Sequence, residues 1–183
     1  MRIILALARA AGADRLIPVS RAHVDSVLYH GQACQDFVEW LTSVDARVAV
    51  PTTLNVAALD LVHPWLFHGT EAEASAGRRL VDGYLALGCQ PTMTCAPYQA
   101  ADRPGLGEDV AWAESNAIVF VNSVLGARTA RYGDFSDAAA AVPDDARSAA
   151  LAHRITSRTS VTRPARAAAA TMAGLIMSVR PVG

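Results

Sequence analysis

The stretch that decides the fold runs from Gly107 to Phe135 and reads GEDVAWAESN, then AIVFVNSVL, then GARTARYGDF. Two polar clusters bracket a segment that is as apolar as a strand in a protein core. A sequence that served packing alone would have little reason to keep Glu, Ser, Asn, Arg and Thr so close to its core. We therefore expect a buried strand over residues 118–121, a short helix over residues 108–115, and functional side chains around them.

Helices and strands are predicted to alternate along the rest of the chain. Apolar periodicity predicts helices over residues 3–11, 32–44, 56–62 and 70–87. The second of these is expected to carry Phe37, Val38, Trp40 and Leu41 on one face. Short apolar runs predict strands over residues 16–19, 47–50 and 89–94. This alternation predicts an α/β fold, a parallel sheet with helices on both faces.

Small polar residues follow each predicted strand. They are Ser20 and His23, then Thr52, Thr53 and Asn55, then Thr94 and Cys95, and finally Asn122 and Ser123. Ligands of parallel sheets bind beyond the carboxyl ends of the strands. Four segments are therefore expected to bring hydrogen-bonding groups and a thiol to one edge of the sheet.

Composition narrows the class of protein. With 183 residues, 52% of them hydrophobic and 18% charged, the chain suits one domain with a sizeable core. It has no apolar stretch near the ~20 residues that span a bilayer, and its net charge of −1 gives no reason to expect nucleic acid. The three cysteines lack the spacing of a disulfide framework or a zinc motif. We expect a cytoplasmic protein.

A shift in charge marks a boundary near residue 141. Residues 1–141 carry 10 Arg against 15 Asp and Glu, whereas residues 142–183 carry 6 Arg against 2 Asp. We predict a domain over residues 1–141 and a divergent tail rich in Arg and Ala over residues 142–183. The tail is expected to be disordered, or to be a region read in another frame.

Several side chains have both a structural and a functional interpretation. Most free cysteines are small buried hydrophobes, but Cys95 at a strand end could be a nucleophile or a metal ligand. Polar residues beside a buried strand are either networked with one another or face a ligand, which applies to Glu114, Ser115 and Asn116. Arginine pairs with carboxylates or phosphates, so Arg128 and Arg131 either bind substrate or form a structural ion pair with an acid such as Asp134.

Two motifs together resemble the catalytic domain of the aconitase X family. They are Thr94-Cys95-Ala96-Pro97-Tyr98 and the stretch over residues 107–135. The family comprises iron–sulfur hydro-lyases and includes phosphomevalonate dehydratase and cis-3-hydroxy-L-proline dehydratase. The resemblance covers about residues 1–141 and implies a dehydratase of a small hydroxy acid.

The resemblance also implies a cofactor, a partner and a set of site residues. Cys95 would be one of three ligands of an iron–sulfur cluster whose open iron holds the substrate hydroxyl. A serine of a small swivelling domain or subunit would act as the base. We expect substrate contacts from Ser20, His23, Thr52, Thr53, Asn55, Glu114, Ser115, Asn116, Arg128 and Arg131.

The family's two other cluster cysteines and its base-bearing domain lie beyond the part of the family that this chain resembles. We therefore expect the chain alone to be inactive or only weakly active. Three alternatives stay open. The chain could be a metal-free module that binds small molecules, a thiol enzyme with Cys95 as nucleophile and His23 as base, or a gene product without function.

Overall fold

The computed structural model describes residues 2–13, 15–131, 133–142 and 149–152. A small parallel sheet lies at its centre, in the order β3-β2-β4. Its strands are β2 (Ala22–Val24), β3 (Thr52–Leu54) and β4 (Ala111–Trp112). Isolated parallel bridges, Thr53 to Gln90 and Asp109 to Arg128, extend the sheet on either side.

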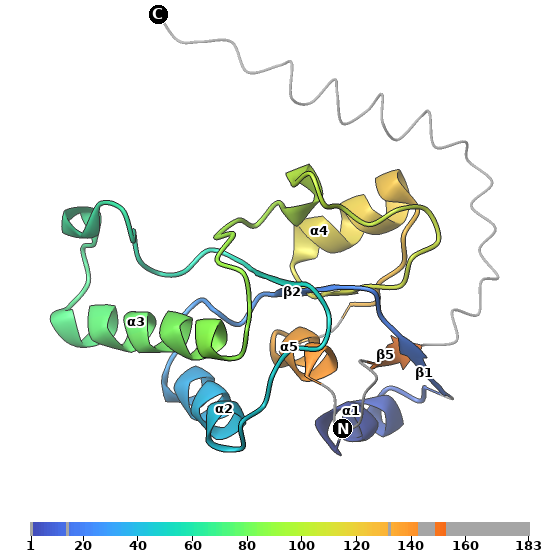
Figure 1. The fold of residues 1–183 in the computed structure, drawn as a ribbon, viewed down its shortest axis with the longest axis horizontal. Helices are drawn as coiled ribbons and strands as arrows, with labels where there is room; N and C mark the ends of the chain where they lie inside the picture. The colour runs from blue at the N-terminus through green and yellow to red at the C-terminus, as the bar shows by residue number, and fades with distance from the viewer. Residues whose placement is uncertain (1, 14, 132, 143–148, 153–183) are drawn as a thin grey trace, which may run out of the picture.

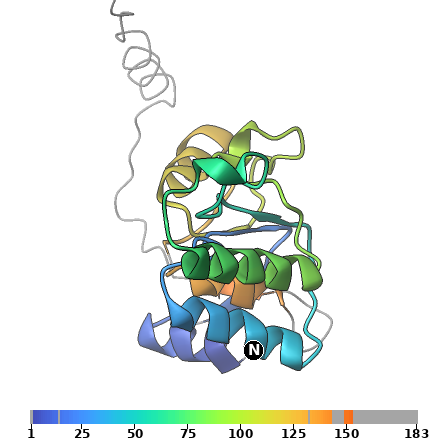
Figure 2. The same ribbon diagram turned by 90° about the vertical axis from the view of Figure 1, so that its left-hand side faces the viewer.

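Four helices lie below this sheet in the views of Figures 1 and 2. They are α1 (Arg2–Ala10), α2 (Gln32–Ser43), α3 (Glu71–Ala86) and α5 (Phe135–Ala141). Val24 and Leu54 point from the sheet into an apolar cluster with Val38 of α2 and Leu80 and Tyr84 of α3. Burial of these large side chains contributes to the hydrophobic stabilisation of the fold.

The opposite face of the sheet is covered by α4 (Ser115–Phe120), which continues into the π-helical turn η3 (Val121–Leu125). The 3₁₀ turn η2 (Pro97–Gln99) packs beside α4. A smaller cluster of Val110, Trp112, Ala117 and Val121 fills the space between. The predicted α/β fold, a parallel sheet with helices on both faces, is therefore confirmed.

The three longer predicted helices are present, and their ends follow local chemistry. Thr70 and Glu73 form a reciprocal capping box at the start of α3. Gly88 follows its last turn at a φ of 96°, a conformation that glycine adopts at little cost. The buried face of α2 carries Val38 and Leu41 together with Cys34 and Gln35, whereas Trp40 is 52% exposed.

The stretch over residues 107–135 folds differently from expectation. The predicted strand over residues 118–121 is helix, and the predicted helix over residues 108–115 contains β4 instead. Ala117 and Val121 are both fully buried while Val119 is 57% exposed. Burial four residues apart is the spacing of a helix, and it outweighed the β-branched composition of the run.

Other short elements were also misplaced. The strand expected over residues 47–50 forms later, as β3, and residues 89–94 make only the bridge at Gln90. The helix expected over residues 56–62 is irregular, and the chain first turns at η1 (Pro64–Leu66). β2, at the centre of the sheet, was not predicted.

The strand expected over residues 16–19 is β1 (Arg15–Pro18), which stands apart from the parallel sheet. It pairs in antiparallel fashion with β5 (Ala149–Ala152). β5 lies beyond the predicted boundary at residue 141, and the rest of the predicted tail, residues 143–148 and 153–183, is outside the described residues. In the described part, no helix has the length and apolar character needed to cross a bilayer.

Candidate functional site

Three polar side chains meet where the parallel strands end. Asp25 follows β2, Asn55 follows β3, and Glu114 comes two residues after β4. Asn55 is buried, and its Nδ2 group donates hydrogen bonds to Asp25 Oδ1 and, over 2.6 Å, to Glu114 Oε2. We call Asp25, Asn55 and Glu114 the rim cluster. One amide therefore holds two carboxyl groups together at the carboxyl edge of the sheet.

Burial and the nearby Glu114 raise the pKa of Asp25 to about 6, against the lowering effect of the Asn55 hydrogen bond. Two carboxyl groups this close resist simultaneous ionisation, so one of them retains a proton up to a higher pH than usual. A proton can thus be held at the rim, or released from it, near neutral pH. Such paired acids are common where proton transfer occurs.

Asp137 of α5 supports the rim cluster from below. It is 1% exposed, and its Oδ2 accepts a hydrogen bond of 2.7 Å from the backbone amide of Asp25. Its Oδ1 accepts another from the amide of Ala138. Burial raises the pKa of Asp137 well above its ordinary value. This contact fixes the backbone at the point where β2 ends.

His23 occupies the middle of the central strand and is fully buried. Its Nδ1 lies 2.7 Å from Thr53 Oγ1, and its ring meets Trp112 edge to face at 6.1 Å. Its Nε2 has no hydrogen-bond partner of ordinary geometry among the described residues. Burial lowers the pKa of His23 to about 4, so the imidazole is neutral at physiological pH.

Cys95 leaves the sheet at the same edge as Asn55. The amide of Thr94 donates to the carbonyl of Leu54, the residue before Asn55. Cys95 is exposed, whereas Cys34 and Cys89 are buried in the core below the sheet. Burial raises the pKa of Cys89 to about 12. Of the three thiols, Cys95 is therefore the one that can meet a ligand.

Ser115 and Asn116 of α4 lie next to the rim cluster in sequence, and both are exposed. Ser115 Oγ donates to Glu114 Oε1 over 3.3 Å. Asn116 Nδ2 donates to the hydroxyl of Tyr98, whose ring stacks on Phe120 at 4.1 Å. These contacts attach η2, and with it the segment that carries Cys95, to α4.

Other predicted site residues lie elsewhere along the strands. Ser20 and Thr52 lie at the amino end of the sheet, so the expectation that all four segments reach one edge is wrong for them. Ser20 Oγ donates to Glu108 over 2.9 Å, and Thr52 Oγ1 donates to the carbonyl of Val50. Strand β1 lies outside the parallel sheet, and for this reason its end does not mark the carboxyl edge. Asn122, with Ser123, lies in η3, where its side chain hydrogen-bonds the backbone of Thr129.

The two arginines differ in their surroundings. Arg128 forms a two-pronged ion pair with Asp109, with Nε 2.9 Å from Oδ1, and also donates to the carbonyl of Gly107. Arg131 is exposed, two residues beyond Thr129, whose hydroxyl bonds the backbone of Trp112. Arg128 is thus engaged in the structural ion pair that was one of its two expected roles.

The family model for the aconitase X first domain matches residues 1–149. The chain belongs to the aconitase X family. It is 48% identical over 138 residues to cis-3-hydroxy-L-proline dehydratase of Pseudomonas aeruginosa. It is 39% identical over 144 residues to the phosphomevalonate dehydratase large subunit of Thermococcus kodakarensis. These relatives are dehydratases of hydroxy acids.

A solved aconitase X from Thermococcus kodakaraensis, in its holo form, has the same fold, with a TM-score of 0.71 and 36% sequence identity. That alignment covers 83% of this chain and 36% of the solved one. The two dehydratase alignments cover 75% and 78% of this chain but only 24% and 35% of the relatives. This aconitase X chain therefore spans about a quarter to a third of the length of the curated relatives it matches.

An iron–sulfur cluster, which the family suggests, is held by several cysteine thiolates. The described residues offer one such thiol, Cys95, and contain no group of three or more His, Cys, Asp or Glu placed to hold a metal ion. By themselves they do not fit a cluster.

Two acids at the site were missed by sequence reasoning. Asp25 had no clear signal, because it follows β2, a strand that the sequence did not predict. Asp137 stood out as the one acid within the alanine-rich segment over residues 135–141. An acid on a helix that is buried throughout has to be hydrogen-bonded, and Asp137 bonds the site backbone.

Proposed function

We propose that this aconitase X chain forms one wall of the substrate site of a hydroxy-acid dehydratase, and that its substrate class is that of cis-3-hydroxy-L-proline. One observation carries the proposal: Asn55 holds Asp25 and Glu114 together at the carboxyl edge of a parallel sheet, beside the exposed Cys95. This is where ligands of such sheets bind. The family membership and the named activities of the relatives support the reaction class.

Dehydration removes a hydroxyl group from one carbon and a proton from its neighbour, so that water leaves. The site must therefore bind the hydroxyl, orient the carboxylate and accommodate proton movement. The Asp25–Glu114 pair can hold a proton near neutral pH because the pKa of Asp25 is raised to about 6. Ser115 lies beside the pair with a hydroxyl that can bond the substrate, and the exposed Arg131 is proposed to bind its carboxylate.

The charge distribution favours an amino-acid substrate over a phosphorylated one. Phosphate sites usually combine several cations with free backbone amides. Here the guanidinium of Arg128 is occupied by Asp109 and Gly107. The rim cluster contributes carboxyl groups, which attract an ammonium group and repel a phosphate. The higher identity to the hydroxyproline enzyme points the same way.

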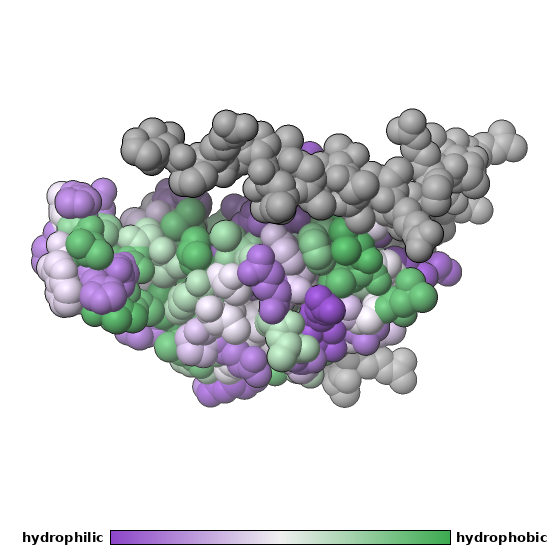
Figure 3. All heavy atoms as spheres, turned by 90° about the horizontal axis from the view of Figure 1, so that it is seen from above, coloured by the Kyte–Doolittle hydropathy of each residue, from purple (hydrophilic) through white to green (hydrophobic). Residues whose placement is uncertain are grey.

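The remaining parts of the active assembly are proposed to come from further polypeptide, which is either joined to this segment in one chain or bound to it as a separate subunit. These parts are the further ligands of an iron–sulfur cluster and the small domain or subunit that carries the base. Hydrophobic residues are exposed at both ends of the face seen in Figure 3. Large apolar side chains that are exposed in the described part of the chain include Leu61, Val62, Leu66, Leu106, Val119 and Val124. Such side chains suit contact with polypeptide that corresponds to the part of the relatives outside these alignments.

Protection of Cys95 tests the proposed site on the chain as it exists. Iodoacetamide should add one group to the native protein, at Cys95, because the other two thiols are buried. Saturating cis-3-hydroxy-L-proline should slow this reaction about fivefold or more, and trans-4-hydroxy-L-proline should not. Asn55→Asp, which places a third carboxylate between Asp25 and Glu114, should abolish the protection.

Equal alkylation rates with and without cis-3-hydroxy-L-proline would remove the proposed substrate class. Turnover by the isolated chain after anaerobic cluster reconstitution would contradict the proposal that further polypeptide is required. Cis-3-hydroxy-L-proline could protect Cys95 from alkylation while the chain takes up no iron, even after the remaining part of a relative is added as a separate polypeptide. That result would favour the metal-free binding module.

The thiol-enzyme alternative has less support. A base for Cys95 would need to hydrogen-bond the thiol. His23 is fully buried, its Nδ1 bonds Thr53, and its pKa is lowered to about 4. Alkylation of Cys95 that follows the titration of His23 in a pH series would restore this alternative.

A further inference from the structure

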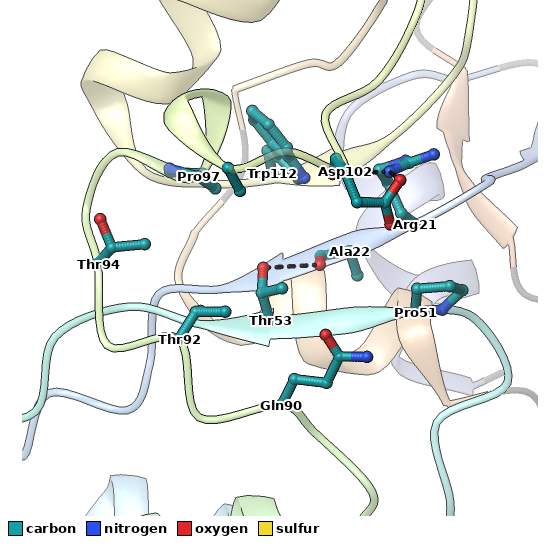
Figure 4. Close-up of a pocket in the computed structure, with 11 residues that line it drawn as sticks. Arg21, Ala22, Pro51, Thr53, Gln90, Thr92, Thr94, Pro97, Asp102 and Trp112 are labelled. Atoms are coloured by element: carbon teal, nitrogen blue, oxygen red, sulfur yellow. Dashed lines mark hydrogen bonds and ion pairs between the residues drawn. The ribbon is translucent and has the colours of Figure 1, made fainter.

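A hollow lies on the α4 side of the sheet, under the loop that follows η2. Figure 4 shows Ala22 and Thr53 of the sheet below it, and Pro97, Asp102 and Trp112 above. Its volume is about 90 Å³. Its polar end is formed by Arg21 and Asp102, which lie near the amino end of β2. Asp25 lies beyond the opposite end of the same strand, so the polar end of this hollow is distinct from the rim cluster, and none of Asp25, Asn55 and Glu114 lines the hollow.

Two buried N–H groups at this hollow have no hydrogen-bond partner within the described residues. They are Nε1 of Trp112, a residue that is 2% exposed, and Nε of Arg21. Both are donors only and cannot be satisfied by rotation of the group. A buried donor without a partner is destabilising and is rare in folded proteins. Since both residues line the hollow, one acceptor group placed there could bond to both.

At the polar end of the hollow, by contrast, acceptor groups outnumber the cationic group that they surround. Arg21 Nη1 lies 2.8 Å from Asp102 Oδ1, and Arg21 Nη2 lies 3.5 Å from Glu108 Oε2. Two carboxylates thus face one guanidinium, which leaves the polar end of the hollow with an excess of negative charge. A simple anion would be repelled by that charge, whereas a cation next to Asp102 would be attracted.

We propose that this hollow binds a small zwitterionic amino acid of the size of glycine or alanine. Its carboxylate accepts hydrogen bonds from Trp112 Nε1 and Arg21 Nε, and its ammonium group pairs with Asp102. The volume matches about three water molecules, which leaves no room for a long side chain. Ala22 and Pro97 give the Cα of the ligand an apolar surface. The proposal stands independently of the dehydratase assignment.

The indole N–H of Trp112 provides a direct readout. The chain has three tryptophans, so a ¹⁵N-labelled sample gives three indole signals, and Trp112→Phe identifies the one that belongs to Trp112. Glycine and alanine should shift that signal saturably and leave the signals of the exposed Trp40 and Trp65 in place. Acetate, which lacks the ammonium group, should bind about tenfold more weakly or worse, since it loses one charge-assisted pair. Leucine should not bind.

Two variants separate the two ends of the ligand. Asp102→Asn changes a side chain that is 79% exposed, so the fold should be retained, and it should weaken glycine binding about tenfold without weakening acetate binding. Arg21→Lys keeps the positive charge but lacks Nε–H, and it should weaken both ligands. Arg78→Lys, on α3, is the matched control and should change neither.

An unmoved Trp112 signal in glycine, alanine and acetate would overturn the proposal and show that the hollow holds water only. Equal affinity for glycine and acetate, together with unchanged binding in Asp102→Asn, would also overturn it, because the ammonium contact would then be absent.

Discussion

His23 makes the stability of this domain sensitive to acid, and the size of the effect follows from its burial. The ring is fully buried, and burial lowers its pKa from 6.5 to about 4. In the unfolded chain the imidazole is protonated as the pH falls through 6.5, while in the folded state it stays neutral down to about 4. The unfolded state therefore binds more protons in this window, and folding stability falls as the pH falls.

The two pKa values differ by about 2.5, which corresponds to about 3 kcal/mol once both titrations are complete. At pH 4.5 the loss relative to pH 7.5 is about 2.5 kcal/mol. Asp25 acts in the opposite direction over part of the same range, because its pKa is raised to about 6. A comparison of the wild type with a His23 variant cancels the Asp25 contribution, since Asp25 is present in both proteins.

His23→Asn isolates the effect, because an asparagine amide can reach Thr53 in place of Nδ1 and does not titrate. Urea unfolding followed by circular dichroism, at pH 7.5 and pH 4.5, gives the free energy of unfolding of each protein. The variant should be less stable at pH 7.5 and should recover about 2 to 2.5 kcal/mol relative to wild type at pH 4.5. His30→Asn, at an exposed histidine, controls for the loss of one imidazole.

A wild-type-to-variant difference that stays within about 0.5 kcal/mol between the two pH values would refute this reasoning. An NMR titration of the His23 ring in the wild type gives an independent check that does not depend on whether the variant folds. A midpoint near 6.5 in that titration would contradict the burial argument.

Three further substitutions have definite expected outcomes. Asp25→Asn removes a carboxyl whose folded pKa is raised, so the wild type should lose about 1–2 kcal/mol, after allowance for solvent screening, as the pH rises from 4 to 7; equal pH dependence in the variant would contradict this. Thr70→Ala breaks the capping box with Glu73 and should cost about 1 kcal/mol in urea unfolding, whereas an unchanged midpoint would mean that the box adds nothing. In Gly83→Ala the new Cβ would lie 2.3 Å from Val38 Cγ1, so the melting temperature should fall despite the better helix propensity of alanine, and a rise would show that α2 can move away.

The sequence predicted the longer helices well because their signals are local. Capping residues, a terminal glycine and apolar spacing bound α3 at both ends. The strands were harder, since each has only two to four residues and owes its existence to partners far along the chain. β2, for example, pairs with β3 and with β4, some 30 and 90 residues away. The local sequence Ala22-His23-Val24 has no pattern that indicates a strand at the centre of a sheet.

The same reasoning explains which parts of the candidate site could be found. Asn55 was predicted to follow a strand and therefore to lie at the carboxyl edge. Glu114 was selected only as a polar residue before a buried strand expected over residues 118–121, a segment that is helical in the structure. Ser20 was predicted at that edge because residues 16–19 were expected to form a strand of the parallel sheet. In the structure these residues belong largely to β1, which pairs with β5 instead. The hydrogen bond between Asn55 and Asp25 depends on the register in which β2 pairs with β3. This register cannot be read from the sequence.

The two faces of the sheet have different physical characters, and this separates stability from function. Toward α2 and α3 the buried contacts are apolar, as at Val24 and Leu54. Toward α4 the buried layer holds polar rings, those of His23 and Trp112, and the indole Nε1 of Trp112 has no hydrogen-bond partner among the described residues. Since buried unpaired polar atoms destabilise a fold, a layer selected only for packing would replace them. Conservative apolar substitutions below the sheet should therefore change the unfolding midpoint but not ligand affinity. Substitutions above it, such as Trp112→Phe, should change affinity more than stability.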